Sequence, residues 1–405
     1  MLDAKTKPDN VVVSDLDIFT PENIRNPLGW HPILRDAAPV VWLSKYGVWA
    51  TGRHELVNEI LKDYKTYCSS AGVGLANFHK EEPWRPPSLL LEADPPDHTG
   101  RREVAGRVMS HANLRRMKAT FEKEAALLVD RLLDKDDVNG VDDIAQAYIL
   151  KVFPDAIGLK PEGRENLLPY GNMVFNGFGP RNEIFDEAMK RAAPISEYIM
   201  KCCTREELST DGLGAQVYEA CDNGEISEHE ALFIVRSYLG AGLDTTVDTI
   251  GNVINAFASY PEQWTKLRQD PSRMRAAIEE VIRFDSPFQG VFRTAARDVE
   301  IGGVQIAEDD KILVAPGAAN HDPRRWDNPD EFDIDRDASG HMGFGYGIHE
   351  CVGQVIARLE MEALFGEMVK RVERIEPVGP TQRRLNNTLH GFEKLPVKLV
   401  GAAAN

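Results

Sequence analysis

The sequence predicts a mainly α-helical fold with a minor β portion. Four segments carry apolar residues at helical spacing, and these are residues 113–133, 227–259, 271–284 and 352–372. Two further segments are rich in β-branched and aromatic residues broken by turn residues. No low-complexity tract or internal repeat interrupts the 405 residues, so we expect a globular chain whose length suits two or three domains or one large core.

The β portion is expected in two places. Residues 40–52, VVWLSKYGVWATG, are β-branched and aromatic on both sides of a glycine, which predicts a hairpin. Residues 290–315, GVFRTAARDVEIGGVQIAEDDKILVA, offer three short strands separated by turn residues. Most of the remaining chain is expected to be helical.

The longest helical segment, 227–259, has an unusual centre. Residues 240–246, GAGLDTT, place two glycines, an acid and two adjacent threonines, all poor helix formers, where an apolar stretch is expected. On helical spacing, five side chains share one polar face: Ser237, Ala241, Asp244, Thr245 and Asp248. One interpretation is a solvent-exposed side with a bent turn. The other, favoured by glycines beside an acid and an alcohol, is a helix opened for a ligand.

Composition excludes some classes of function. The net charge of −17 argues against a protein that wraps nucleic acid or coats an anionic membrane, because both need a dominant positive surface. The first residues show no secretory signal or membrane anchor, so a cytoplasmic location is expected. Five scattered cysteines without a CxxC pair indicate a reducing compartment and no compact zinc site.

A glycine-rich stretch at 341–354, HMGFGYGIHECVGQ, precedes the last helical segment. Its glycine spacing does not fit a dinucleotide fingerprint, because the third glycine position holds Ile348, and no Gly-Lys-Ser/Thr follows. His349 and Cys351 are two residues apart, which suits no common tetrahedral zinc spacing. The stretch therefore predicts neither a phosphate loop nor a zinc site.

A single thiolate ligand to haem iron explains these residue types better. Cys351 stands just before a helix, whose free N–H groups and positive end would stabilise an anionic sulfur. Gly347 allows a tight turn, Gly353 allows close approach to a flat macrocycle, and Phe344 can shield the sulfur. His349 can reach a haem carboxylate. The alternative for an isolated Cys-x-Gly is a buried cysteine on a glycine turn.

The pattern Phe344-x-x-Gly347-x-x-x-Cys351-x-Gly353 resembles the cysteine loop of the cytochrome P-450 haem-thiolate monooxygenases. Further motifs are similar to that family in the same order: DPPDHTGRR at 94–102, Ala241-Gly242-x-Asp244-Thr245-Thr246, Glu280-x-x-Arg283, VFRTAARDVEIGG at 291–303 and RRWDNPDEFDIDR at 324–336. The resemblance implies one haem domain over residues 1–405, with the triangular helical prism and small sheets of that family.

The resemblance also implies roles for individual residues. It implies a haem b with Cys351 as its thiolate ligand, and propionates held by His98, Arg102, Arg293 and His349. Thr245 would hydrogen-bond the distal oxygen of bound dioxygen, and Asp244 would relay protons. A structural Glu280–Arg283 pair would be completed by Arg336. Either member of such an i, i+3 pair is also compatible with a solvated helix surface.

Electrons must come from a separate protein, and the resemblance implies a ferredoxin with its NAD(P)H-dependent reductase. An acidic ferredoxin needs a basic patch, and residues 100–118 carry five arginines and one lysine against one acid, Glu103. A solvated helix and turn explain any single one of these charges equally well.

A proline-rich loop, EEPWRPPSLLLEADPP at 81–96, suggests the substrate. Its prolines favour an extended path with three residues per turn, which places Arg85 and Ser88 on the same side as a grip for a carboxylate. Ser237 lies two helical turns before Thr245, roughly 12 Å away by helix rise, a span that suits one benzene ring. A surface loop with a solvated arginine is the alternative.

This loop, together with FPDAIGLK, VFNGFGP, VRSYLGAGLDTT and NNTLHGFEKLPVKL, resembles the bacterial subfamily that oxidises para-substituted benzoates, typically by demethylating 4-methoxybenzoate. The resemblance implies contacts of the ring with Phe175, Phe178, Ala241, Phe288 and Val291, although such residues are equally typical of a core. Three positions depart from the subfamily: Gly240 replaces an expected serine, Phe288 and Val291 are exchanged in bulk, and Gly100 replaces a common arginine.

The expected activity is oxidation of a para-methoxy or para-alkyl benzoate, with 4-hydroxybenzoate and formaldehyde as the products of the methoxy acid. One alternative is a haem-thiolate hydroxylase of a terpenoid or another neutral molecule, which would have no use for the carboxylate grip. Another is a non-catalytic haem sensor, which would have no use for Asp244 and Thr245.

Overall fold

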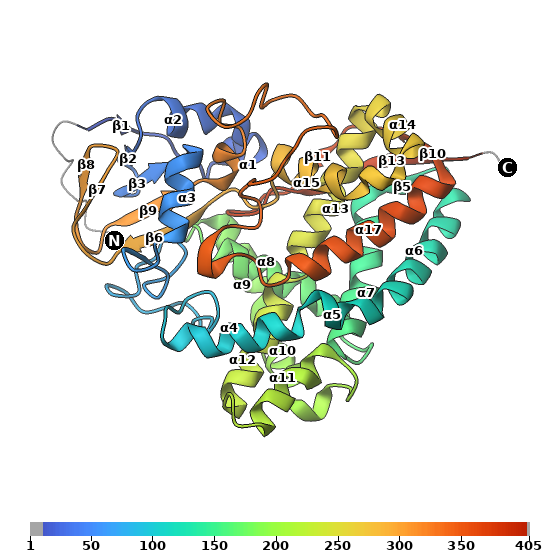
Figure 1. The fold of residues 1–405 in the computed structure, drawn as a ribbon, viewed down its shortest axis with the longest axis horizontal. Coiled ribbons are helices and arrows are strands. Elements are labelled where there is room, and N and C mark those ends of the chain that lie inside the picture. Colours follow the sequence, from blue (N-terminus) through green and yellow to red (C-terminus); the bar gives the residue numbers. More distant parts are fainter. Residues whose placement is uncertain (1–10, 403–405) are drawn as a thin grey trace.

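Helices dominate the computed structural model, which describes residues 11–402 (Figure 1). The predicted mainly helical fold with a minor β portion is confirmed. The helices are α1 Pro21–Arg25, α2 His31–Asp36, α3 His54–Lys62, α4 Asp97–Val108, α5 His111–Leu114, α6 Lys118–Leu133, α7 Ala147–Ile157, α8 Leu167–Asn176, α9 Glu183–Ala192, α10 Ser196–Cys202, α11 Leu213–Asp222, α12 Glu228–Ala241, α13 Asp244–Ser259, α14 Pro261–Gln269, α15 Met274–Phe284, α16 Pro316–Ala319 and α17 Gln354–Arg371.

Within residues 11–402, the strands form one six-stranded sheet and three small ones. The larger sheet has the order β1-β2-β3-β9-β6-β4, and it lies at the side of the triangular outline opposite α6 and α17 (Figure 1). The strands are β1 Val13–Ser14, β2 Val41–Leu43, β3 Val48–Thr51, β4 Tyr67–Cys68, β5 Val138–Asn139, β6 Val291–Ala295, β7 Val299–Ile301, β8 Val304–Ile306, β9 Lys311–Val314, β10 Val372–Pro377, β11 Gln382–Arg383, β12 Phe392–Lys394 and β13 Pro396–Gly401.

Both predicted β segments form strands, with one correction. The hairpin at 40–52 is β2 and β3, in which Trp42 pairs with Trp49. Residues 290–315 contain four strands instead of three. Gly302 and Gly303 both have positive φ, so the chain turns back between β7 and β8 and makes a small hairpin of its own.

The long middle helix is interrupted where the sequence predicted an opening. Helix α12 ends at Ala241 and α13 begins at Asp244. The hydroxyl groups of Thr245 and Thr246 donate to the carbonyl oxygens four residues earlier, at 2.8 Å and 3.1 Å, which competes with regular helical bonding. A side chain at Gly242 would overlap the ring of Phe153, so glycine permits close packing here.

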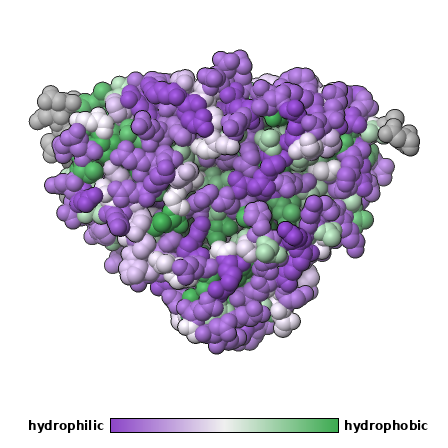
Figure 2. Space-filling view, in the orientation of Figure 1, coloured by the Kyte–Doolittle hydropathy of each residue, from purple (hydrophilic) through white to green (hydrophobic). Residues whose placement is uncertain are grey.

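Helix α13 runs through the centre of the molecule and is buried along nearly its whole length. Its apolar side chains join one large cluster with α6, α7, α8, α15 and α17, so these helices share a core. The face seen in Figure 2 is mostly hydrophilic, with hydrophobic residues only in small patches. Among residues 11–402 no helix has the length and apolar character that a membrane crossing requires.

Candidate active site

A large, mostly apolar cavity lies between the α12–α13 junction and the loop that carries Cys351. Ser237, Ala241 and Thr245 line it from one side of the interrupted helix, and Phe344 and Cys351 line it from the loop. Polar side chains gather at two places, around Arg102 and Arg293 and around Arg85. The cavity therefore has an apolar body with two separate cationic regions.

The loop before α17 presents the sulfur of Cys351 to this cavity. The backbone N–H of Cys351 donates to the carbonyl oxygen of Phe344 at 2.8 Å, which closes the loop on itself. Gly347 has φ 73°, and a Cβ there would lie 2.4 Å from the Leu61 carbonyl oxygen, so the turn requires glycine. Burial raises the pKa of the Cys351 thiol, while the Gly353 backbone and Arg102 oppose that shift. A metal cation such as iron, bound by the sulfur, would favour the thiolate form of Cys351.

The first cationic region contains the four residues expected at the haem carboxylates. Arg102, Arg293 and His349 line the cavity, and His98 packs on His349 with ring centroids 4.5 Å apart. The Nε2 atoms of both histidines are buried without a hydrogen-bond partner, and burial lowers the pKa of His98 to about 4. Burial also lowers the pKa of Arg293 to about 10.

These residues fit a haem. Arg293 is buried and Arg102 is half-buried, and both supply positive charge. The Nε2 atoms of His98 and His349 make no hydrogen bond, and His349 Nε2 lies 3.7 Å from the carboxylate of Asp94. A thiol faces the same apolar space. A flat, apolar macrocycle with two carboxylates and an iron atom satisfies all three features.

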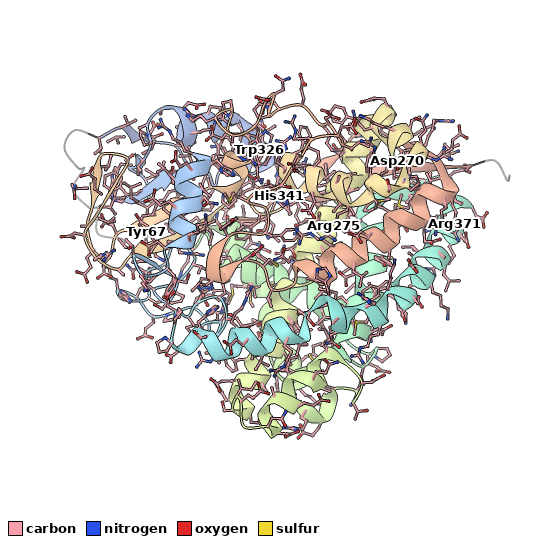
Figure 3. All side chains as sticks on the ribbon, in the orientation of Figure 1. Tyr67, Asp270, Arg275, Trp326, His341 and Arg371 are labelled. Atoms are coloured by element: carbon pink, nitrogen blue, oxygen red, sulfur yellow. The ribbon has the colours of Figure 1, made fainter. Side chains whose placement is uncertain are left out.

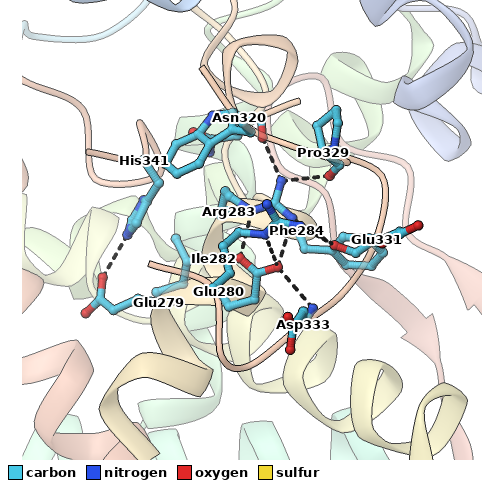
Figure 4. Close-up of polar contacts among 12 residues, drawn as sticks. Glu279, Glu280, Ile282, Arg283, Phe284, Asn320, Pro329, Glu331, Asp333 and His341 are labelled. Carbon is cyan, nitrogen blue, oxygen red and sulfur yellow. Dashed lines mark hydrogen bonds and ion pairs between the residues drawn. The ribbon is translucent and has the colours of Figure 1, made fainter. Parts of the chain in front are cut away.

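Two networks hold the cysteine loop and the segment before it, residues 324–336, which we call the meander. In the first, the carboxylate of Glu280 accepts from Arg283 Nε at 2.7 Å (Figure 4). It also accepts from Arg336 Nε at 3.1 Å. Arg283 is fully buried and also donates to three carbonyl oxygens, those of Asn320, Pro329 and Glu331. The structure thus brings together the predicted trio, and its cationic members bind the backbone of the meander.

The second network is centred on Glu279, which the sequence analysis did not single out. Its carboxylate lies 2.7 Å from His341 Nε2 and accepts from Arg358 at 2.5 Å, while Arg275 lies 3.2 Å away; His341 and Arg275 are labelled in Figure 3. Arg358 also stacks on Phe344, at 4.2 Å from the ring centroid. Glu279 therefore ties α15 to both ends of the cysteine loop.

We expect this network to make the protein sensitive to acid. Burial alone would raise the pKa of Glu279, but hydrogen bonds from His341 and Arg358 lower it to about 2. Since the folded pKa lies below the ordinary value of 4.5, the stabilisation is present above pH 4.5 and disappears as the pH falls toward 2. Glu279→Gln should lower the free energy of unfolding by about 2–3 kcal/mol near neutral pH.

Urea unfolding followed by circular dichroism measures this difference. The difference in the free energy of unfolding between the wild type and Glu279→Gln should become smaller as the pH is lowered from about 6 to about 3. A difference that stays constant over this range would contradict the electrostatic role of Glu279.

The acid–alcohol pair is split by the structure. Thr245 lines the cavity, but Asp244 and Asp248 face a separate groove on the other side of α13, lined in part by Asp142. Arg384 donates to both acids, at 2.9 Å and 2.5 Å. The prediction that Asp244 and Asp248 share one face with Thr245 is therefore wrong. The helix is interrupted, and an arginine far away in the sequence binds the two acids from the opposite side.

The environment of the two acids shifts their pKa values upward. Burial raises the pKa of Asp244, and raises that of Asp248 to about 6, while Arg384 opposes both shifts. The Oδ2 atom of Asp244 is buried without a hydrogen-bond partner and lies where a side chain at Gly171 would be. Asp244 therefore lies on the groove side of α13 and does not line the cavity.

The second cationic region contains the three residues that the sequence analysis predicted would bind a carboxylate. Arg85, Ser88 and Ser237 all line the cavity, and the two hydroxyl oxygens are 3.2 Å apart. Ser237 donates to the carbonyl oxygen of Phe233 at 2.8 Å, so Ser88 is the donor between the two serines. Arg85 lies 3.0 Å from Glu92, a contact the sequence did not indicate.

A second arginine at this end was missed. Arg236 lines the cavity, stacks on Phe233 at 4.0 Å and donates to the carbonyl oxygens of Pro86 and Pro87 at 3.1 Å and 3.2 Å. Burial lowers its pKa. An arginine inside the apolar run LFIVRSYL was the available signal, because a buried guanidinium needs partners or a ligand.

The apolar body of the cavity contains the expected ring contacts. Phe175, Phe178, Phe288 and Val291 line it, and Phe175 contacts Phe178 and Phe288 edge to face, with centroids 5.9 Å and 6.3 Å apart. Gly240 also lines it, with Tyr170 the nearest neighbour of the absent side chain at 3.5 Å.

Much of the basic segment 100–118 is neutralised within the protein. Arg101 pairs with Glu230 at 2.6 Å, and Arg107 pairs with Glu225 at 2.8 Å. The net positive charge of this surface is therefore smaller than the sequence suggested.

Comparisons with known proteins agree with this geometry. Residues 205–398 match the family described as Cytochrome P450. The chain is 48% identical over 388 residues to "Cytochrome p450 CYP199A2" of Rhodopseudomonas palustris, covering 96% of this chain and 94% of that protein. It is 33% identical to "Cytochrome P450 107B1" of Saccharopolyspora erythraea, covering 76% of each. Cytochrome P450 CYP109Q5 from Chondromyces apiculatus has a similar structure, with a TM-score of 0.80, 29% identity, and 96% and 99% of the two chains covered.

Proposed function

The chain belongs to the cytochrome P450 family, and from this premise we propose that it oxidises para-substituted benzoic acids, with 4-methoxybenzoate as the reference substrate. Membership makes it a haem-iron monooxygenase with a cysteine thiolate as axial ligand, and Cys351 is the cysteine that lines the cavity. The choice of substrate rests on one observation. The cavity is otherwise apolar and lined by phenylalanines, but one end of it carries four polar or cationic side chains: Arg85, Ser88, Ser237 and Arg236.

This arrangement suits a short aromatic acid. A carboxylate accepts well from guanidinium and hydroxyl groups, and edge-to-face phenylalanines accommodate one benzene ring. A neutral terpenoid would leave the buried guanidinium groups without a ligand, at a cost in binding free energy. The carboxylate would therefore fix which end of the ring faces the cysteine loop.

The bound haem supplies dioxygen activation. The hydroxyl of Thr245 lies at the cavity wall and donates to the Ala241 carbonyl oxygen at 2.8 Å. This hydroxyl would hold a proton in position for transfer into the cavity. Asp244 would pass protons on from the groove side after leaving Arg384.

The proposed reaction uses dioxygen, two electrons and two protons. One oxygen atom is inserted into a C–H bond of the methoxy group and the other leaves as water. The resulting hydroxymethyl ether then breaks its C–O bond to give 4-hydroxybenzoate and formaldehyde. We propose a ferredoxin with an NAD(P)H-dependent reductase as the electron source.

Binding of an acid and its ester tests the choice of substrate. Titration of the haem protein with 4-methoxybenzoate should displace water from the iron and shift the Soret band, whereas the methyl ester should bind at least roughly tenfold more weakly. Equal affinity for the two compounds would contradict the proposal and favour a neutral substrate.

Arg85→Ala is the matching variant. It should weaken binding of 4-methoxybenzoate by roughly ten- to a hundredfold, since a charge-assisted hydrogen bond is lost, while affinity for the ester changes little. Arg101→Ala, which removes an arginine paired with Glu230 that is not among the cavity-lining residues, is the control and should leave both affinities unchanged.

A further inference from the structure

The charges at the acid end of the cavity do not cancel. Arg85 and Arg236 contribute two positive charges, and Glu92 contributes one negative charge next to Arg85. Arg236 donates hydrogen bonds to neutral acceptors, the carbonyl oxygens of Pro86 and Pro87. Before a ligand enters, these three side chains together carry one net positive charge.

Glu92 is held in place on both sides. One of its oxygens lies 3.0 Å from Arg85 Nη1 and accepts from the Ser88 backbone N–H at 2.7 Å. Its own backbone N–H donates to the Ser88 carbonyl oxygen at 3.0 Å, and its side chain is only 2% exposed. A carboxylate fixed in this way stays beside Arg85 when a ligand binds.

The charge balance limits which ligands suit the site. A single negative charge on the ligand neutralises the acid end, so that no net charge remains in a desolvated region. A neutral ligand leaves the positive charge uncompensated. A doubly charged ligand brings a surplus negative charge close to Glu92, which repels it.

We propose that Glu92 is a specificity-determining residue that restricts the acid end of the cavity to ligands with a single negative charge. The proposal rests on the proposed function, since it assigns the charge of the acid whose carboxylate Arg85, Ser88 and Ser237 bind. Glu92 acts through electrostatics and does not need to touch the ligand.

The test compares the wild type with Glu92→Gln in the haem-loaded protein. The amide oxygen of glutamine keeps an acceptor for the Ser88 N–H, so the loop retains that bond while the charge is removed. The probe is 4-methoxyphenylphosphonate, whose head group carries one negative charge at low pH and two after its second ionisation. Its affinity is measured by the Soret shift across that ionisation, alongside 4-methoxybenzoate and its methyl ester.

In the wild type, phosphonate affinity should fall as the second charge appears. In Glu92→Gln the fall should disappear or reverse, and 4-methoxybenzoate should bind roughly tenfold more tightly while affinity for the ester is unchanged. Glu225→Gln, which removes an exposed surface carboxylate, should behave as the wild type. Parallel pH profiles in the wild type and Glu92→Gln, or an equal change for acid and ester, would overturn the proposal.

A second variant, Arg236→Gln, tests the charge balance in case Glu92→Gln fails to fold. Arg236→Gln removes one positive charge, so it should abolish the preference for 4-methoxybenzoate over the ester. Retention of that preference would also overturn the charge balance. A failure of the proposed function can be distinguished from a failure of this proposal. In that case the wild type itself would bind 4-methoxybenzoate no more tightly than its methyl ester.

Discussion

Cys351→Ala is expected to abolish monooxygenase turnover, with a loss of at least on the order of 10³-fold, and to remove the thiolate signature from the reduced carbon-monoxide spectrum. The sulfur lies at the cavity wall beside Phe344 and Arg102, and no other cysteine of residues 11–402 lines that cavity. Without it the iron loses the ligand that favours cleavage of the O–O bond.

Cys221→Ala provides the matched control. Cys221 lies in α11 and is partly exposed, so its removal should leave spectrum and turnover unchanged. A thiolate spectrum that survives in Cys351→Ala would mean that another residue binds the iron, and the assignment of the site would be wrong.

Arg283→Met is expected to lower the free energy of unfolding by about 3–5 kcal/mol and to release the haem. The substitution leaves the buried Glu280 with Arg336 as its remaining cationic partner, and it removes the hydrogen bonds to Asn320, Pro329 and Glu331 (Figure 4). The measurement is the urea midpoint together with haem content after purification.

The double variant Glu280→Leu with Arg283→Met distinguishes charge from packing. If the cost in Arg283→Met comes from the uncompensated carboxylate, the double variant should recover part of the stability. Equal instability of the single and double variants would contradict this explanation and assign the role to the meander contacts.

Local sequence motifs predicted the parts of the site that depend on short-range geometry. The turn at Gly347 and the position of Cys351 before a helix follow from residue types within a few positions of each other. The interruption between α12 and α13 could likewise be read from Gly242 and the paired threonines. Each of these depends on backbone conformation that neighbouring residues determine.

Long-range ion pairs could not be predicted. Nothing near Asp244 in the sequence indicates that Arg384, 140 residues later, binds it and turns it away from the cavity. The pairing of Arg85 with Glu92 is shorter in range, but the sequence analysis assigned Arg85 either to the carboxylate of a ligand or to solvent. Such contacts depend on how the loop and the C-terminal strands pack on α12 and α13, and a pattern of apolar residues does not specify that packing.

The split between Thr245 and Asp244 has a mechanistic consequence. Under the proposed function, Asp244 would pass a proton toward Thr245 after exchanging its contact with Arg384 for one nearer the cavity. The unpartnered Oδ2 of Asp244 and the absence of a side chain at Gly171 leave the carboxylate free of steric hindrance from that residue. The proposed function therefore places substrate binding and proton delivery on opposite sides of α13.

Turnover with a ferredoxin and its reductase tests the central claim most directly. The measurement is the amount of 4-hydroxybenzoate and formaldehyde formed from 4-methoxybenzoate per NAD(P)H oxidised. We expect the two products in equal amounts, close to one per NAD(P)H, and much slower turnover of the methyl ester. Oxidation of NAD(P)H without these products, or equally fast conversion of the ester, would contradict the account.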